Sequence, residues 1–175
     1  GSTAAIDCPT GTYTASSGMG ELLNCGPCPA GKACSTAGTS ASLVDCSKGH
    51  YCPAGTKNPY DYTCPPGTFS DAVNNKASVD CTDCPTGKAC LEMSTTVAET
   101  ITMTVGTKTT NAVKDCAAGH YCPIRTEFPT QFPCPVGTFT TATNLAAASA
   151  CTQCPAGKWC PAGSPNSNTD CPKNF

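Results

Sequence analysis

The chain contains few of the large apolar residues from which globular proteins build a core. Leucine, isoleucine, valine and phenylalanine together account for 20 of its 175 residues, about 11%. A share below about 20% normally marks a sequence that cannot offset its conformational entropy by burying apolar surface. A conventional hydrophobic core is therefore excluded, and another kind of interaction must stabilise the fold.

Charge is scarce as well. Charged residues make up 13% of the chain and the formal net charge is -2, so we expect no nucleic-acid partner. No run of 18 apolar residues occurs, so we expect no membrane span in this window. The first residues, GSTAAID, lack the basic and apolar regions of a signal peptide, and we expect any secretion signal to lie upstream.

Helical periodicity is missing too. Glycine and proline number 16 each, and no stretch keeps a 3.6-residue apolar period for three turns. Cysteine, by contrast, is abundant: 17 of 175 residues is close to the share that marks a disulfide scaffold in secreted proteins. The composition therefore predicts turns and short strands held together by disulfides.

The cysteines recur in a fixed pattern, which identifies a tandem array. The same spacing occurs in CPTGTYTASSGMGELLNCGPCPAGKAC from Cys8, CPPGTFSDAVNNKASVDCTDCPTGKAC from Cys64 and CPVGTFTTATNLAAASACTQCPAGKWC from Cys134. The first two copies continue to a fifth and a sixth cysteine, and eleven residues then lead to the next copy. The repeating unit therefore has six cysteines.

These spacings set the predicted boundaries. Residues 1–7 are the end of a preceding linker, and repeat one covers 8–63, repeat two 64–133 and repeat three 134–175. Repeat three ends before its sixth cysteine, which explains the odd total and indicates a window cut from a longer array. Pairing of the leftover cysteine with a neighbouring molecule is the alternative explanation.

The start of each repeat predicts a turn. Cys-Pro-x-Gly-Thr precedes an aromatic residue, Tyr13, Phe69 or Phe139. Proline fixes one backbone angle and glycine supplies a positive φ, after which a short strand can begin. The fold class is therefore a small, disulfide-rich and mostly irregular one with short β-hairpins, arranged as an elongated rod of tandem six-cysteine repeats.

The CxxC pair in each repeat has three interpretations. A zinc site of Cys25, Cys28, Cys34 and His50 can be drawn. It leaves Cys46 and Cys52 without a role, and repeat three has no matching histidine. A redox site needs the pair at a helix start in a βαβ unit, and the sequence predicts none. Structural disulfides are therefore favoured, at about 3 kcal/mol for each loop of roughly 15 residues. With no acid pair, nucleophile–histidine pair or phosphate-binding loop, we expect neither an enzyme nor a cofactor.

The motif CPxGT, followed by CxxCPxGxxC and GxYCPxGT, resembles the ephrin-receptor-like cysteine-rich repeats and the tumour-necrosis-factor-receptor cysteine-rich domain. Such repeats are found in receptor ectodomains, ciliate surface antigens and algal flagellar hair proteins. The resemblance implies pairing of the first cysteine with the second, the third with the fifth and the fourth with the sixth. The implied pairs are Cys8–Cys25, Cys28–Cys46, Cys34–Cys52, Cys64–Cys81, Cys84–Cys116, Cys90–Cys122, Cys134–Cys151 and Cys154–Cys171, with Cys160 unpaired in this window.

Repeat two carries an insert at about residues 94–113. Its run ETITMTVGTKTTNAV alternates threonine with Ile101, Met103 and Val105 and is expected to turn at Gly106 and Thr107. This pattern predicts a β-hairpin with one apolar face. An isolated hairpin is marginally stable, so the face packs on its own repeat or forms an assembly contact.

Hydroxyl side chains are frequent, with 27 threonines and 13 serines. None of the nine asparagines begins an N-glycosylation sequon. Clusters of threonine are candidate O-glycosylation sites, although threonine is also a good strand residue. The candidates are Thr107, Thr109, Thr110, Thr138, Thr140, Thr141 and Thr143.

Two functions fit these observations. The first is a non-catalytic structural protein of the cell surface or extracellular space, part of a coat, stalk or fibre that self-associates and carries O-linked glycans. The second is a receptor-type module that binds a protein ligand. The chain has one tryptophan, Trp159, and one arginine, Arg125, and such residues dominate binding hot spots, so the structural function is favoured. Trp159 itself is either a contact anchor or a cap over the adjacent disulfide.

Overall fold

The computed structural model describes residues 7–14, 25–36, 43–96, 100–103, 106–109, 111–167 and 169–171, without the side chains of 100–103 and 106–109. The chain forms two compact units. Unit 1 comprises Gly1–Pro65, Ser70–Thr82 and Thr100–Lys108, and unit 2 comprises Pro66–Phe69, Asp83–Glu99 and Thr109–Phe175. No helix among the described residues is long and apolar enough to cross a membrane.

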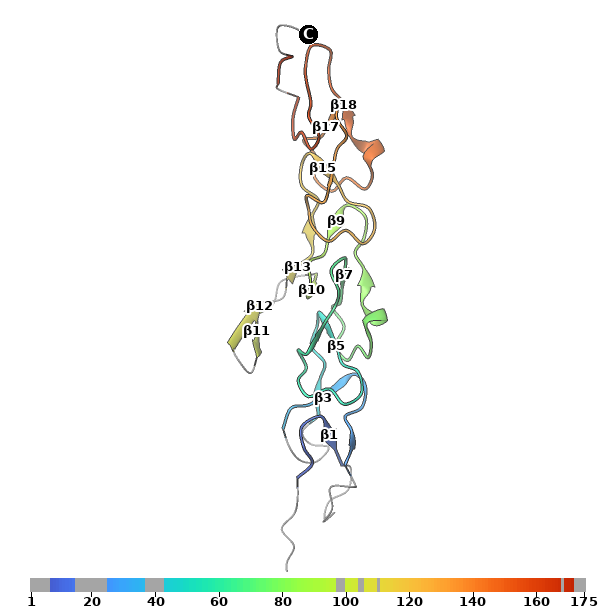
Figure 1. The fold of residues 1–175 in the computed structure, drawn as a ribbon, viewed down its shortest axis with the longest axis vertical. Helices are drawn as coiled ribbons and strands as arrows, with labels where there is room; N and C mark the ends of the chain where they lie inside the picture. The colour runs from blue at the N-terminus through green and yellow to red at the C-terminus, as the bar shows by residue number, and fades with distance from the viewer. Residues whose placement is uncertain are drawn as a thin grey trace, which may run out of the picture. The chain divides into compact units, whose positions relative to one another are not determined.

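Short strands and turns make up both units (Figure 1). The strands are β1 (Thr12–Tyr13), β2 (Gly26–Pro27), β3 (Lys32–Cys34), β4 (Leu43–Asp45), β5 (His50–Tyr51), β6 (Tyr62–Thr63), β7 (Thr68–Phe69), β8 (Thr82–Asp83), β9 (Lys88–Ala89), β10 (Ser94–Thr95), β11 (Thr100–Met103), β12 (Gly106–Thr109), β13 (Asn111–Ala112), β14 (Lys114–Asp115), β15 (His120–Tyr121), β16 (Phe132–Pro133), β17 (Thr138–Phe139) and β18 (Thr152–Gln153). Two 3₁₀ turns lie at Ser78–Asp80 and Ala148–Ala150.

Most strands form two-stranded antiparallel sheets. These pairs are β1–β2, β3–β4, β5–β6, β9–β14, β15–β16 and β17–β18. The predicted fold class, small and disulfide-rich with short β-hairpins, is confirmed at this level.

The Cys-Pro-x-Gly-Thr segments form the predicted turn. In repeat one, Gly11 has φ 85°, and Thr12 donates its backbone N–H to the carbonyl of Pro9 at 3.0 Å. The Thr12 hydroxyl donates to the same carbonyl at 2.7 Å, which is why a hydroxyl residue suits the position after glycine. The turn leads directly into β1, and its counterparts lead into β7 and β17.

Successive turns are joined by a ladder of backbone hydrogen bonds. In most turns the N–H of the residue at the glycine position donates to a carbonyl distant in the sequence, and its own carbonyl accepts from a cysteine N–H. In unit 1, Gly31 donates to Cys52 at 2.8 Å and accepts from Cys46 at 3.1 Å. In unit 2, Gly87 donates to Cys122 at 2.8 Å and accepts from Cys116 at 3.0 Å. The ladder gives backbone groups partners where no long sheet could do so.

Eight disulfides close the loops. Three join cysteines 17 positions apart and coincide with the pairs that the resemblance implies for the first two cysteines: Cys8–Cys25, Cys64–Cys81 and Cys134–Cys151. The other five join cysteines six positions apart: Cys28–Cys34, Cys46–Cys52, Cys84–Cys90, Cys116–Cys122 and Cys154–Cys160.

The expectation for the third to sixth cysteines is therefore wrong. Cys28–Cys46, Cys34–Cys52, Cys84–Cys116, Cys90–Cys122 and Cys154–Cys171 do not form in the structure. The reason is local, because the turn between two cysteines six positions apart brings their Cα atoms to 5.7–6.0 Å, a distance that suits a disulfide. Cys160 is paired with Cys154, and the free, exposed cysteine is Cys171.

Cysteine also forms the interior. Among the described residues, every buried apolar side chain other than Ala33, Ala89 and Met93 belongs to a cysteine. This agrees with the scarcity of large apolar residues in the sequence. Sulfur and backbone hydrogen bonds take the place of a hydrophobic core.

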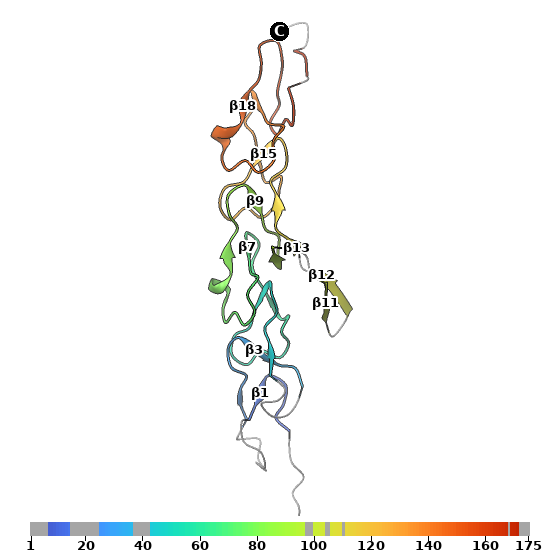
Figure 2. The same ribbon diagram turned by 180° about the vertical axis from the view of Figure 1, so that it is seen from behind.

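The insert of repeat two forms two separate structures. Its ends, β10 and β13, pair in parallel with each other, and β10 pairs with β7, so repeat two has a four-stranded sheet in the order β13-β10-β7-β8. Between them β11 and β12 form the expected hairpin, and both views show its two strands side by side (Figures 1 and 2). The predicted turn position is wrong, because Gly106 and Thr107 lie in β12.

Candidate functional site

The contact between repeats one and two is a close approach of two backbones. A Cβ atom on Gly31 would lie 2.6 Å from the carbonyl oxygen of Asn74, so no other residue fits at this position without a shift. Asn74 has φ 67° and donates its N–H to the carbonyl of Cys46 at 3.1 Å. We call this arrangement of a turn glycine, an asparagine of the next repeat and the carbonyl of the fifth cysteine the junction seat.

Repeats two and three meet in the same way. A Cβ atom on Gly87 would lie 2.5 Å from the carbonyl oxygen of Asn144, which has φ 67° and donates its N–H to Cys116 at 3.1 Å. Asparagine tolerates the left-handed conformation better than most residues. Two independent junctions thus have one geometry.

A surface ion pair lies beside each junction seat. Lys32 pairs with Asp45 and Lys88 with Asp115, and both pairs are partly exposed. The pKa of Asp115 is lowered mainly by the hydrogen bond from Lys88 and further by one from Asn144. The pKa of Asp45 is lowered mainly by the hydrogen bond from Lys32, with a smaller contribution from Asn74.

Repeat three has the corresponding pair, Lys158 with Asp170 at 2.6 Å. The sequence contains a signal for these pairs that our sequence analysis missed, because an aspartate precedes the fifth cysteine in all three repeats. The recurrence of the lysines is equally visible in the sequence, but only the pairing of β3–β4 and β9–β14 places lysine opposite aspartate.

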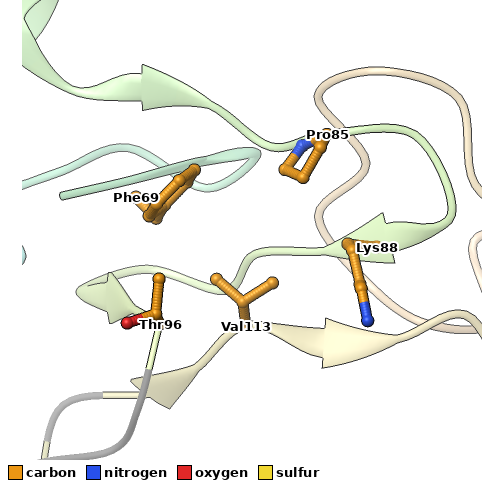
Figure 3. A pocket seen from close by; sticks show the side chains of 5 residues that line it. All are labelled: Phe69, Pro85, Lys88, Thr96 and Val113. Carbon is orange, nitrogen blue, oxygen red and sulfur yellow. The ribbon is translucent and has the colours of Figure 1, made fainter. Parts of the chain in front are cut away.

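Repeat two also has an open hollow of about 270 Å³. Phe69 and Pro85 line one side, and Thr96 and Val113 line the other, with Lys88 at one end (Figure 3). Thr96 and Val113 belong to the insert, so repeats one and three have no equivalent of this wall. The alternating residues of the insert predicted only a hairpin, so the hollow was not expected.

The predicted interface residues are only partly described. Ile101 and Met103 lie on β11, but their side chains, and all of Val105, are outside the described residues. Trp159 is half exposed and donates its backbone N–H to Thr169 at 2.8 Å.

The candidate O-glycosylation sites differ in how exposed their side chains are. Thr140 is 5% exposed, so its hydroxyl is poorly accessible to a glycosyltransferase in the folded chain. Thr138 is half-buried and donates its hydroxyl to Pro135 at 2.6 Å. Thr141 and Thr143 are exposed. The side chains of Thr107 and Thr109, and all of Thr110, lie outside the described residues.

The zinc alternative is not supported by the geometry. Cys25 is bonded to Cys8, and Cys28 to Cys34, so neither has a thiolate to offer. Among the described residues, no group of three or more histidine, cysteine, aspartate or glutamate side chains is placed to hold a metal ion. His50 is instead buried, with Nδ1 2.8 Å from the carbonyl oxygen of Lys48.

No protein-family model matches the chain, and no curated protein matches it either. The resemblance to receptor-type cysteine-rich repeats therefore stays an expectation.

Proposed function

We propose that this chain is part of a non-catalytic, extracellular structural protein, a disulfide-stapled repeat array that forms a surface coat, stalk or fibre. The junction seat carries the proposal. Because Gly31–Asn74 and Gly87–Asn144 have the same close approach and the same hydrogen bond, one contact can be propagated along an array of such repeats. A repeat protein is stabilised mainly by such nearest-neighbour contacts.

The disulfides and the surface composition also support a structural role. Eight disulfides need an oxidising environment such as the extracellular space. The surface contains few charged, tryptophan or arginine side chains, and the exposed threonines Thr141 and Thr143 offer hydroxyls for O-linked glycans. We assign no catalytic residue and no cofactor.

Electron microscopy of the protein from its native source, without reductant, tests the proposal. We expect fibres or sheets with a regular repeat. Dispersed particles at all concentrations would contradict self-assembly.

The hairpin β11–β12 is the first contact to test in such fibres. Ile101→Thr combined with Met103→Thr removes the apolar side chains of β11, and Val79→Thr, at an exposed apolar side chain outside the hairpin, is the control. Loss of fibres in the hairpin variant alone would place the contact there. Fibres in both variants would leave the structural function standing and exclude the hairpin contact.

A receptor-type binding module is the second candidate, and the hollow in repeat two favours it. Phe69, Pro85 and Val113 give the hollow an apolar lining that suits a side chain of a protein ligand. Under this function the native protein stays dispersed, and Val113→Asp abolishes capture of a soluble protein ligand. Retained capture by that variant would exclude the hollow as the binding site.

A further inference from the structure

The same turn occurs before the last strand of repeats one and two. In repeat one it spans residues 58–61, where Asp61 donates its N–H to Asn58 at 3.1 Å. In repeat two it spans residues 128–131, where Gln131 donates its N–H to Phe128 at 3.1 Å. A proline occupies the second position of both turns, which fits the backbone angle that a β-turn requires there.

Both turns are anchored to the body of their repeat. The carbonyl of Pro59 accepts from Ser47 at 3.4 Å, and that of Pro129 accepts from Ala117 at 3.0 Å. The side chain of the fourth residue accepts a hydrogen bond from the backbone N–H of the first, Asp61 from Asn58 at 2.9 Å and Gln131 from Phe128 at 3.4 Å. The third residue of each turn is therefore held in a fixed position.

That third residue differs between the two turns. In repeat one it is Tyr60, whose ring contacts the ring of His50 edge-on at a centroid distance of 5.6 Å, and His50 is fully buried. In repeat two it is Thr130, and the matching histidine, His120, is partly exposed. Threonine has no ring, so repeat two lacks the aromatic contact that Tyr60 makes with His50 in repeat one.

Thr130 differs from the nearby Thr126 in its exposure and in its hydrogen bonding. Its side chain is exposed, and its hydroxyl has no hydrogen-bond partner among the residues that the structure describes. Thr126 is 1% exposed and donates its hydroxyl to Pro123 at 2.7 Å. Thr130 is also flanked by Pro129 and Pro133, and threonine beside proline is the compositional signal for O-linked sugars.

We propose that Thr130 carries an O-linked glycan whose first sugar ring lies where repeat one has the phenol ring of Tyr60. The Thr130 hydroxyl oxygen attacks the anomeric carbon of a nucleotide-activated sugar and forms the new carbon–oxygen bond. The bond from that carbon to the nucleotide phosphate breaks, the nucleoside diphosphate leaves with the electron pair, and a base of the glycosyltransferase takes the hydroxyl proton. This proposal rests on the proposed extracellular function, because a secreted protein is exposed to glycosyltransferases on its way out of the cell.

The neighbouring surface suits a sugar. Phe128, two positions before Thr130, is 49% exposed, and an aromatic face offers apolar contact to the carbon-bound hydrogens of a sugar ring. Nδ1 of the partly exposed His120 lies 3.1 Å from the carbonyl oxygen of Ala118, which leaves Nε2 for a hydrogen bond to a sugar hydroxyl. A sugar at this position would cover both side chains.

Secretion of the full chain from a eukaryotic host, followed by mass spectrometry with fragmentation that keeps glycans attached, tests the site. We expect the fragment with Thr130 to carry at least one sugar. Thr130→Val removes the hydroxyl with little change in shape and should lose that sugar completely. Thr141→Val and Thr143→Val, at exposed threonines without an adjacent proline, should retain the Thr130 sugar.

Three results would overturn the glycan proposal. An unmodified Thr130 in oxidised, secreted protein would overturn the proposal, and so would a phosphate at this residue or a Thr130→Val variant that keeps the sugar mass. If protein without the Thr130 sugar still forms fibres, only the glycan proposal is overturned and the structural function stands. A glycosylated Thr130 on protein that stays dispersed would instead contradict self-assembly and leave this site standing.

Discussion

Gly87 in repeat two and Gly157 in repeat three occupy the same position of the same turn, and both have φ 79°. Their surroundings differ. A Cβ atom on Gly87 would lie 2.5 Å from the carbonyl oxygen of Asn144, whereas one on Gly157 would meet no described atom within 4 Å. The turn therefore needs glycine for its backbone angle in both repeats, but only Gly87 is also needed for the close approach of the next repeat.

Removal of disulfides should have the largest effect and should not distinguish the two repeats. Cys84–Cys90 and Cys154–Cys160 each join cysteines six positions apart. Replacing either pair by alanine should lower the free energy of unfolding by about 2 kcal/mol, because the unfolded chain gains conformational entropy. Denaturant unfolding followed by circular dichroism measures this. A loss confined to one repeat would mean that packing, rather than loop closure, sets the contribution.

Alanine substitution of Gly87 and of Gly157 should destabilise the two repeats to different extents. Gly157→Ala should cost about 1 kcal/mol, because a side chain resists a positive φ. Gly87→Ala should cost more than that, up to about 2 kcal/mol, because its Cβ atom also clashes with a backbone oxygen.

Hydrogen exchange at the Asn144 amide, which bonds to Cys116, gives a second readout of this pair. Gly87→Ala should speed that exchange at least tenfold, and Gly157→Ala should leave it unchanged. Equal effects of the two variants would show that the close approach contributes nothing.

The sequence predicted the units of this fold better than their connections. The Cys-Pro-x-Gly-Thr turn followed from the angles that proline and glycine prefer, and the strands β1, β7 and β17 begin where it predicts. The pairing of Cys84 with Cys116 came from a resemblance rather than from the residues, and the local closure of Cys84 with Cys90 replaced it.

The junction seat could not be predicted from a single repeat. Asn74 and Asn144 recur at one position, but their contact with Gly31 and Gly87 depends on how the backbones of two repeats approach each other. The hollow escaped prediction for a similar reason, because the pairing of β10 with β7 brings the insert beside Phe69.

Asn144→Ala tests the asparagine half of the seat. Asn144 occupies a left-handed conformation and its side chain hydrogen-bonds to Asp115, so its loss should cost about 1 kcal/mol. Asn144→Gly should recover most of the stability, because glycine adopts the same conformation freely. If glycine proved as damaging as alanine in unfolding experiments, the side-chain hydrogen bond would be the main contribution.

The smallest effect concerns pH. The folded-state pKa of Asp115 is lowered, chiefly by the hydrogen bond from Lys88, so the stabilisation from this carboxylate is present above the ordinary pKa of aspartate and is lost as pH falls through the lowered value. Acid titration of stability should therefore be flatter in Asp115→Asn than in the unaltered protein. The control is Glu127→Gln, outside the ion pair, and identical curves for both variants would contradict a role for the pair.

The disulfide map of repeat two tests the central claim, that each repeat is closed by local disulfides, most directly. After trypsin cleavage of the non-reduced protein at its lysine and arginine residues, Cys116 and Cys122 share the peptide 115–125, while Cys84 and Cys90 lie on the separate peptides 77–88 and 89–108. Our account predicts that peptide 115–125 is released alone with an internal disulfide. Peptide 77–88 should be linked to 89–108 through Cys84–Cys90 and to 58–76 through Cys64–Cys81. Peptide 115–125 linked to both 77–88 and 89–108 would contradict it.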